Sequence, residues 1–409
     1  MTTSSLTDST ALYIHFPWCI RKCPYCDFNS HTLREETVPE KQYVDTLLKD
    51  LRQDIARYGA RPVQSIFMGG GTPSLFSGDA MKTLLDGIRT LLPLDTDAEI
   101  TLEANPGTVD NTHFVGYRQA GINRLSIGIQ SFDAAQLKTL GRIHDSSQAL
   151  NAVSVARNAG FDNINLDIMH GLPNQTVDAA MQDLQQAIDC QPTHLSWYEL
   201  TLEPNTLFHR HPPKTPDGDT LWVMQEKGKS LLQQAGFLQY EVSAYAQPNK
   251  QCQHNLTYWR FGDYYGIGAG AHSKLTDPRT GDIVRLTKYK QPKQYLEVRD
   301  DDSTSRRSRV KPGMTVVDNT TTKCADDFVL ERRTLEKAAL PFEYMLNVLR
   351  LQAAVSRTHF ETTTGLSFDV LQPALTELMT KELITFTPDG FTLTDHGHRF
   401  LNDVVSGFL

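Results

Sequence analysis

Apolar residues in the first half of the chain follow two alternating periods. Short runs rich in Ile, Leu and Val are separated by longer stretches in which apolar residues recur every three or four positions. The short runs are typical of buried parallel strands, and the longer stretches are typical of helices with one apolar face. The pattern predicts six strands, over residues 12–16, 63–68, 99–104, 124–129, 163–169 and 194–200.

The segments between these strands have a helical period. Val44, Leu47, Leu48 and Leu51 recur at the i, i+3, i+4 and i+7 spacing of a core-facing stripe. Strict alternation of strands and helices predicts an α/β fold with a parallel sheet and right-handed crossovers. The pattern leaves both an open barrel and a doubly wound sheet open. Further helices are predicted over residues 78–92, 112–120, 147–159 and 177–188.

The regular alternation fades after residue 238. Residues 262–270 predict a glycine-rich loop, because they show neither a strand period nor a helix period. Residues 299–333 are rich in Asp, Ser, Thr and Arg, which predicts a mobile insertion or linker. We therefore assign residues 1–236 to a core domain and residues 237–333 to an irregular flanking region.

The remaining residues, 334–409, form a predicted C-terminal domain. Apolar spacing predicts a helix near residue 340 and a second helix over 370–379. Two short apolar runs, 383–386 and 390–393, flank a Pro-Asp turn and predict a hairpin. Helices followed by a hairpin are typical of a winged-helix-like fold. Because this segment has no concentration of Lys or Arg, we expect it to contact protein or ligand rather than DNA.

Composition narrows the class of protein further. The 409 residues carry a formal net charge of −8, which disfavours a nucleic-acid partner. Cys190, Cys252 and Cys324 are scattered along the chain, as expected in a reducing cytosol. Neither a secretory signal nor an apolar run of about 18 residues is present, so we expect a cytoplasmic protein. Association with a membrane surface is left open.

Three of the six cysteines lie within eight residues: Cys19, Cys23 and Cys26. Three thiolates from one loop can hold three irons of a cubane cluster and leave the fourth iron without a protein ligand. The alternative is structural zinc, with His15 or His31 as the fourth ligand, although such sites normally use paired cysteines. A disulfide is a weaker alternative, because three adjacent cysteines cannot pair among themselves. The spacing favours a cluster over zinc.

Polar residues and glycines follow four further predicted strands. Residues 69–73 form a Gly-Gly-Gly-Thr-Pro turn, and Glu103, Gln130 and Asp167 stand at the ends of the next three strands. The carboxyl ends of parallel strands meet at one edge, where α/β folds bind ligands. Each residue alone is equally well explained as a solvated loop residue. Together they predict a pocket for a polar ligand with several functional groups.

These segments carry a family resemblance, through residues 13–19, the Cys-x3-Cys-x2-Cys loop, the glycine turn, Gly-Ile-Gln-Ser-Phe at 128–132 and His-Gly-Leu-Pro-Asn-Gln at 170–175. The sequence resembles radical S-adenosylmethionine (SAM) proteins, and within them the family of oxygen-independent coproporphyrinogen III oxidase (HemN) and its relatives. The resemblance covers residues 12–270 and returns near residue 340. It implies a partial (β/α)6 TIM-like barrel followed by a HemN-type C-terminal domain.

The resemblance also implies the cofactors and their ligands. Cys19, Cys23 and Cys26 would bind a [4Fe–4S] cluster whose open iron chelates the amine and carboxylate of SAM. Carboxylates suit a sulfonium cation and a ribose, whereas backbone N–H groups and Arg suit a carboxylate. The residues implied to contact the cluster or SAM are Tyr13, Tyr25, Gly71, Thr72, Glu103, Gln130, Arg142 and Asp167.

Two departures separate the chain from the oxidase. The oxidase has a further cysteine just after the loop, where this chain has Phe28. The oxidase also carries an N-terminal extension, and here the first predicted strand begins at Leu12. Phe28 resembles the HemW branch of the family, regarded as haem chaperones.

A second feature similar to that branch is the His-Asn-x-x-Tyr-Trp motif that begins at His254. Imidazole is a common axial ligand of haem iron, and Tyr258 and Trp259 could stack on a porphyrin. Cys252 is a less favoured ligand. In the alternative interpretation, His254 and the two aromatic residues pack this region onto the core.

Three functions are therefore compared. The favoured one is a haem chaperone that binds haem and delivers it to respiratory haemoproteins. No residue is assigned a catalytic role in this function. Whether the protein forms a homodimer is left open. The second is radical decarboxylation of coproporphyrinogen III by an oxygen-independent oxidase of porphyrin biosynthesis. The third is a zinc-stabilised barrel. Phe28 and the short N-terminus favour the chaperone over the oxidase, and the pocket motifs favour either over the zinc protein.

Overall fold

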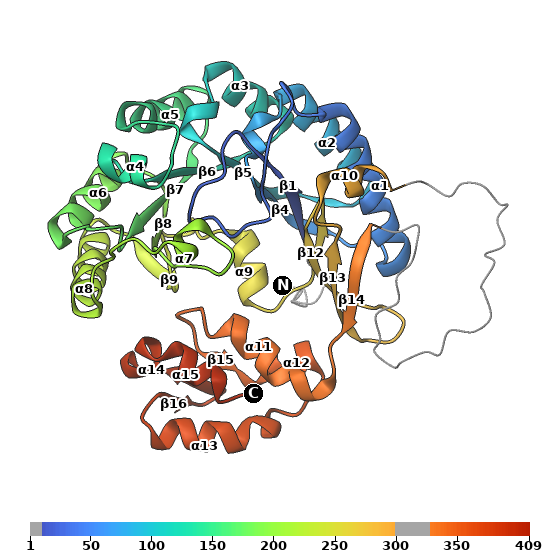
Figure 1. The fold of residues 1–409 in the computed structure, drawn as a ribbon. Helices are drawn as coiled ribbons and strands as arrows, with labels where there is room; N and C mark the ends of the chain where they lie inside the picture. The colour runs from blue at the N-terminus through green and yellow to red at the C-terminus, as the bar shows by residue number, and fades with distance from the viewer. Residues whose placement is uncertain (1–9, 299–327) are drawn as a thin grey trace.

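Six parallel strands form the centre of the protein in a computed structural model that describes residues 10–298 and 328–409. They lie side by side in chain order, each hydrogen-bonded to the next, as in a partial barrel (Figure 1). The six predicted strands and the radical SAM type of α/β fold are confirmed. The strands are β1 (Thr10–Phe16), β4 (Val63–Gly70), β5 (Leu94–Ala104), β6 (Arg124–Gln130), β7 (Asn163–His170) and β8 (His194–Glu199).

Helices connect these strands and cover the outside of the sheet (Figure 1). Side chains cap several helix starts: Ser77 accepts from Ala80 N–H, and Asp145 forms a capping box with Gln148. The predicted helices are present within a few residues of their expected bounds. They are α1 (Glu40–Tyr58), α2 (Gly78–Leu91), α3 (Asn111–Ala120), α4 (Ala134–Thr139), α5 (Ser146–Asn158), α6 (Val177–Asp189), α7 (Leu207–Arg210) and α8 (Gly218–Gln234).

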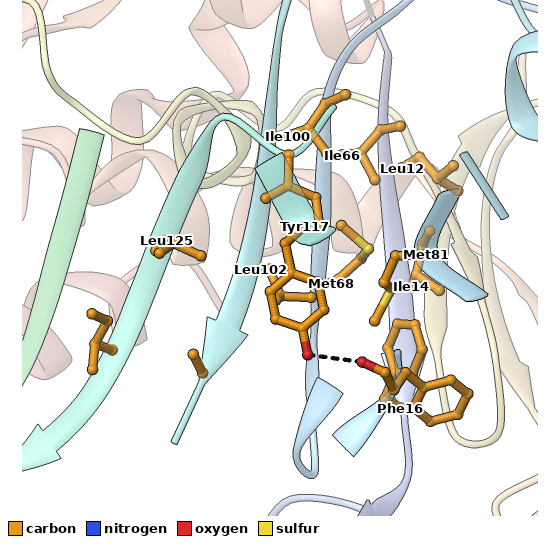
Figure 2. Packing of buried hydrophobic residues seen from close by; sticks show 14 of the residues in the cluster. Leu12, Ile14, Phe16, Ile66, Met68, Met81, Ile100, Leu102, Tyr117 and Leu125 are labelled. Atoms are coloured by element: carbon orange, nitrogen blue, oxygen red, sulfur yellow. Dashed lines mark hydrogen bonds between the residues drawn. The ribbon is translucent and has the colours of Figure 1, made fainter. Parts of the chain in front are cut away.

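Alternation along the strands separates an apolar outer face from a polar interior. Figure 2 shows Leu12 and Ile14 of β1 beside Ile66 and Met68 of β4, and all four are buried. The residues between them along the strands, such as Tyr13, point to the opposite face. The outer face therefore packs against the helices, and the inner face carries the polar side chains.

Residues after 237 continue the same sheet, which reaches twelve strands in the described part of the chain. The expectation of an irregular region is wrong here. β11 lies within the stretch interpreted as a glycine-rich loop and pairs with β1 in parallel. The added elements are β9 (Leu238–Glu241), β10 (Ala244–Ala246), α9 (Gln253–Trp259), β11 (Tyr264–Ile267), β12 (His272–Thr276), β13 (Ile283–Lys288), α10 (Pro292–Leu296) and β14 (Val329–Thr334).

The mobile insertion predicted over 299–333 falls mostly outside the described residues, which resume at Phe328. From Val329 onward the prediction is wrong, because Val329–Thr334 forms strand β14 at the sheet edge. The proposed boundaries at 236 and 333 remain predictions.

The C-terminal segment packs around a second hydrophobic cluster, which includes Tyr344, Phe360 and Phe391 together with Phe261 and Ile283 of the preceding region. The predicted hairpin is present as β16 and β17, and β15 adds a third strand. Arg350 links this segment to the barrel through Glu241, with an N–O distance of 3.2 Å. Its elements are α11 (Leu340–Val348), β15 (Val355–Ser356), α12 (Arg357–Thr364), α13 (Gln372–Thr380), β16 (Ile384–Thr387), β17 (Gly390–Leu393), α14 (Asp395–Arg399) and α15 (Leu401–Ser406).

None of the helices within residues 10–298 and 328–409 has the length and apolar character needed to cross a membrane.

Candidate functional site

The three-cysteine loop begins at the carboxyl end of β1. Two short parallel strands, β2 (Trp18–Cys19) and β3 (His31–Thr32), close the loop at its base. Just before β3 the Asn29 side chain donates to the carbonyl oxygens of Ala269 and Lys290, at 2.9 and 2.8 Å. These contacts hold the loop, which fixes the positions of its cysteines.

Cys19, Cys23 and Cys26 are all free thiols. Burial raises the pKa of Cys19, and the neighbouring Cys26 and Cys23 raise it further. Burial likewise raises the pKa of Cys26. Binding iron as thiolates would offset this cost.

The arrangement of the loop suits a cluster. Across the described residues, no three His, Cys, Asp or Glu side chains are grouped as ligands of a single metal ion. A cubane cluster does not require such convergence, because each cysteine ligates its own iron. The three thiols of one loop therefore fit a [4Fe–4S] cluster.

The glycine turn after β4 lies directly against the cysteine loop. Gly71 N–H donates to Phe16 O at 2.6 Å, and Thr72 N–H donates to Trp18 O at 2.7 Å. A Cβ at residue 71 would lie 2.6 Å from Trp18 O, so only glycine permits this approach. The turn and the loop, 50 residues apart in sequence, thus form one wall.

Arg142 completes this wall from the segment after β6. One guanidinium nitrogen donates to Gly128 O at 2.6 Å, and the other approaches Cys23 Sγ at 3.9 Å. Its Nε is buried and has no hydrogen-bond partner in the described structure. A cleft joins these segments, lined by Ile20, Arg21, Cys23, Thr72, Asn105, Thr108, Gly141, Arg142 and Ile143.

Two carboxylates face the barrel interior near the carboxyl ends of the strands. Burial raises the pKa of Glu103 to about 7, and the negative charge of Asp167 adds to the shift. Gly70 N–H donates to Glu103 at 3.1 Å. Ser126 and Asn165 donate to Asp167 at 3.1 and 2.8 Å, yet burial still raises its pKa. A cationic ligand would relieve this destabilisation, so the pair fits a sulfonium group.

Gln130 occupies the end of β6 in a left-handed conformation, with φ of 71°, where the register with β7 shifts. Tyr198 of β8 donates to its side-chain oxygen at 2.6 Å. Tyr25 lies in the cysteine loop. Burial raises its pKa, and the nearby Arg142 charge offsets only part of this rise. Tyr13 lies on β1, with its hydroxyl 2.9 Å from His15 Nδ1.

Sequence reasoning missed two polar residues of this site. Tyr198 occupies an inward position of a predicted strand, so alternation along that strand could have identified it. Ser30 follows Cys26 by four residues, with its hydroxyl 3.7 Å from Cys26 Sγ. No sequence period indicates that contact, because it depends on the path of the loop.

His254 is placed at the amino end of the strands, apart from the cysteine loop. Its side chain is 1% exposed, with Nδ1 3.3 Å from Ser65 Oγ and Nε2 2.7 Å from the Tyr258 hydroxyl. Burial lowers its pKa to about 3, which keeps the ring neutral. Cys252 beside it is fully buried, with its Sγ 3.5 Å from Glu99. The motif therefore lies at the amino end of the strands, where α9 closes the barrel; we call this end the barrel floor and the carboxyl end its mouth.

The partial barrel and the three-cysteine loop beside its polar mouth define a protein of the radical SAM class. Residues 13–187 match the family described as the Radical SAM superfamily, and residues 335–400 match the HemN C-terminal domain. Membership of this superfamily implies a [4Fe–4S] cluster and SAM as cofactors.

Within that class, the chain belongs to the HemW family. It is similar to "Heme chaperone HemW" of Escherichia coli, with 49% identity over 98% of both chains. The protein of the same name from Haemophilus influenzae is 46% identical over 98% of this chain and 97% of its own length. Among solved structures, the chain is similar to coproporphyrinogen III oxidase (HemN) of Escherichia coli, with a TM-score of 0.78 and 21% identity. That alignment covers 99% of this chain and 91% of HemN, and it shows the shared fold.

Proposed function

We propose that this protein is a cytoplasmic haem chaperone. It binds haem and delivers it to haem-accepting proteins such as respiratory enzymes. The observation that carries this proposal is the full-length similarity to two relatives curated as heme chaperone HemW. The exposed Phe28 supports it, because this residue stands where the resemblance gives the oxidase a further cysteine.

Cys19, Cys23 and Cys26 are the proposed cluster ligands. When bound, the cluster supplies a one-electron redox centre with one open iron. SAM would lie beside the cluster: Gly71 and Thr72 would meet the methionyl end, and the buried Arg142 Nε has no hydrogen-bond partner in the described structure and could bind its carboxylate.

The remaining contacts to SAM are proposed deeper in the barrel mouth. Glu103 and Asp167 would neutralise the sulfonium and bind the ribose, since both carboxylates are buried. Gln130 would present its amide to the ligand, held by Tyr198. Tyr13 and Tyr25 would flank the cluster and SAM.

His254 is the proposed axial ligand of haem. Its neutral ring is suited to bind iron, but both of its nitrogens have hydrogen-bonding neighbours in the barrel floor. Ligation through Nε2 therefore requires Tyr258 to release the ring and α9 to move from the strands.

Haem titration of wild type and His254→Ala tests this assignment. If His254 ligates the iron, the Soret band shifts or weakens in the variant. An unchanged spectrum, with a lower unfolding midpoint, would identify His254 as a packing residue only. A matched control is His113→Ala, because His113 is a partly exposed histidine on α3.

Two activity assays separate the proposed function from the oxidase alternative. We expect haem-loaded protein to transfer haem to an apo-haemoprotein, measured by the acceptor's absorption spectrum. Under anaerobic conditions with reductant, SAM and coproporphyrinogen III, we expect no decarboxylated product from cluster-containing protein. Formation of that product would establish the oxidase activity, and failure of haem binding would contradict the chaperone.

A further inference from the structure

Each of the three cysteine sulfurs lies within hydrogen-bonding distance of a different polar side chain. Thr72 Oγ1 is 3.5 Å from Cys19 Sγ, and Arg142 Nη1 is 3.9 Å from Cys23 Sγ. Ser30 Oγ is 3.7 Å from Cys26 Sγ. When the cysteines are thiolates they can only accept, so all three neighbours become donors.

The donors come from three different segments. Thr72 belongs to the turn after β4, Arg142 to the segment after β6, and Ser30 to the cysteine loop itself. Thr72 and Ser30 are 8% and 5% exposed, so water competes little for their hydroxyl groups. The backbone contact of Thr72 with Trp18 holds its side chain against the loop.

Arg142 is the one charged donor of the three. Its second amino group is fixed by Gly128 O at 2.6 Å, which orients the guanidinium toward Cys23. In the partly desolvated cleft, this positive charge is screened less than one on the surface. Arg34 follows the cysteine loop just after β3 but is exposed and outside the cleft, and therefore provides a comparison.

We infer that Arg142, Thr72 and Ser30 set the reduction potential of the cluster, with Arg142 as the largest contributor. The inference rests on the proposed ligation of the cluster by the three cysteines. One-electron reduction adds a negative charge to the cluster and its thiolates. Donors and a nearby cation stabilise that added charge, so they raise the reduction potential.

The test is an anaerobic redox titration of cluster-containing protein without SAM, with dithionite as electron donor and the reduced cluster followed by electron paramagnetic resonance. In Arg142→Gln, we expect the reduced-to-oxidised ratio at a fixed potential to fall about tenfold, equivalent to about 59 mV for one electron. Thr72→Val and Ser30→Ala should each lower the ratio about threefold, because their donors are neutral.

Arg34→Gln is the matched control, since it removes the same charge from an exposed position outside the cleft. We expect its reduced-to-oxidised ratio to change less than twofold. Equal potentials in Arg142→Gln and Arg34→Gln would overturn the inference. If Arg142→Gln does not retain the cluster, Thr72→Val and Ser30→Ala provide the test, and shifts no larger than that of Arg34→Gln would overturn the inference.

Failure of the proposed ligation gives a different result. Iron and sulfide analysis of Cys19→Ser, Cys23→Ser and Cys26→Ser reports on the ligands alone. A cluster retained in all three variants would contradict the ligation, whatever the potentials of the donor variants. A cluster lost from the cysteine variants, with altered potentials in the donor variants, supports both proposals.

Discussion

The two ends of the barrel interior both contain buried carboxylates, but these carboxylates differ in how far the surrounding protein stabilises their charge. At the amino end, Glu99 lies 3.8 Å from the buried Arg124 and accepts hydrogen bonds from the backbone N–H groups of Gln253 and His254. At the carboxyl end, Glu103 accepts a hydrogen bond from Gly70 and has no ion pair among the described residues.

This difference distinguishes a closed floor from a binding site. The carboxylate of Glu99 caps the start of α9 and is paired with a cation, so the floor is complete without a ligand. Burial destabilises both Glu103 and Asp167; the Arg124 charge offsets only part of this effect at Asp167, and no cation among the described residues offsets it at Glu103. SAM binding is therefore expected at the mouth, and α9 closes the other end, which would have to open for His254 to bind haem.

The largest expected effect comes from removing the cation of the floor. Arg124→Met leaves Glu99 buried without its charge partner, which typically costs about 3–5 kcal/mol of the free energy of unfolding. Urea denaturation followed by circular dichroism measures the loss.

Arg89→Met is the control for this variant. Arg89 pairs with Asp86 at 2.9 Å, but both side chains are more than a third exposed. Surface pairs contribute about 0–1 kcal/mol, so the midpoint should change little. Equal losses in the two arginine variants would show that the floor does not depend on its buried pair.

A smaller effect is expected at the mouth, and it depends on pH. The pKa of Glu103 is raised from 4.5 to about 7 in the folded protein, so the folded state holds this proton more tightly than the unfolded chain. Stability is therefore lost as pH rises from about 4.5 to 7. Glu103→Gln should remove this dependence and be about 1–2 kcal/mol more stable than wild type at pH 8, because the amide carries no charge to desolvate.

The same variant should bind SAM about tenfold more weakly, as isothermal titration calorimetry of anaerobic, cluster-containing protein would measure. A tenfold change corresponds to about 1.4 kcal/mol. The control is Asp97→Asn, an exposed acid on the same strand, which should alter neither quantity. A pH-independent difference between Glu103→Gln and wild type would show that Glu103 is not the titrating group.

The sequence was sufficient to predict the mouth, because its signals are local. The six strands are continuous apolar runs, and parallel strands necessarily bring their carboxyl ends to one edge. This is why Glu103, Gln130 and Asp167 could be assigned to one edge of the sheet. The donor role of Ser30 could not be predicted, because a contact to Cys26 depends on how the loop folds.

The floor could not be predicted because its contacts join distant segments. Glu99 on β5 caps a helix that begins 154 residues later. The glycines of residues 262–270 predict a loop, whereas the structure has strand β11 there. A Cβ at Gly266 would lie 1.8 Å from His272 O, so this glycine is needed inside the sheet. That glycine permits close approach of two strands, which a single sequence does not distinguish from a turn.

The smallest effect tests whether the floor can open at His254. Tyr258→Phe removes the hydroxyl that lies 2.7 Å from His254 Nε2 and should cost about 1 kcal/mol of the free energy of unfolding. If His254 ligates haem, the same change frees Nε2 and should raise haem affinity, measured by absorbance titration. Tyr264→Phe is a control, because the Tyr264 ring packs against the Tyr258 ring with 4.4 Å between centroids but has no hydrogen bond to His254 in the described structure. Lower stability with unchanged haem affinity would mean that His254 closes the barrel and that haem binds elsewhere.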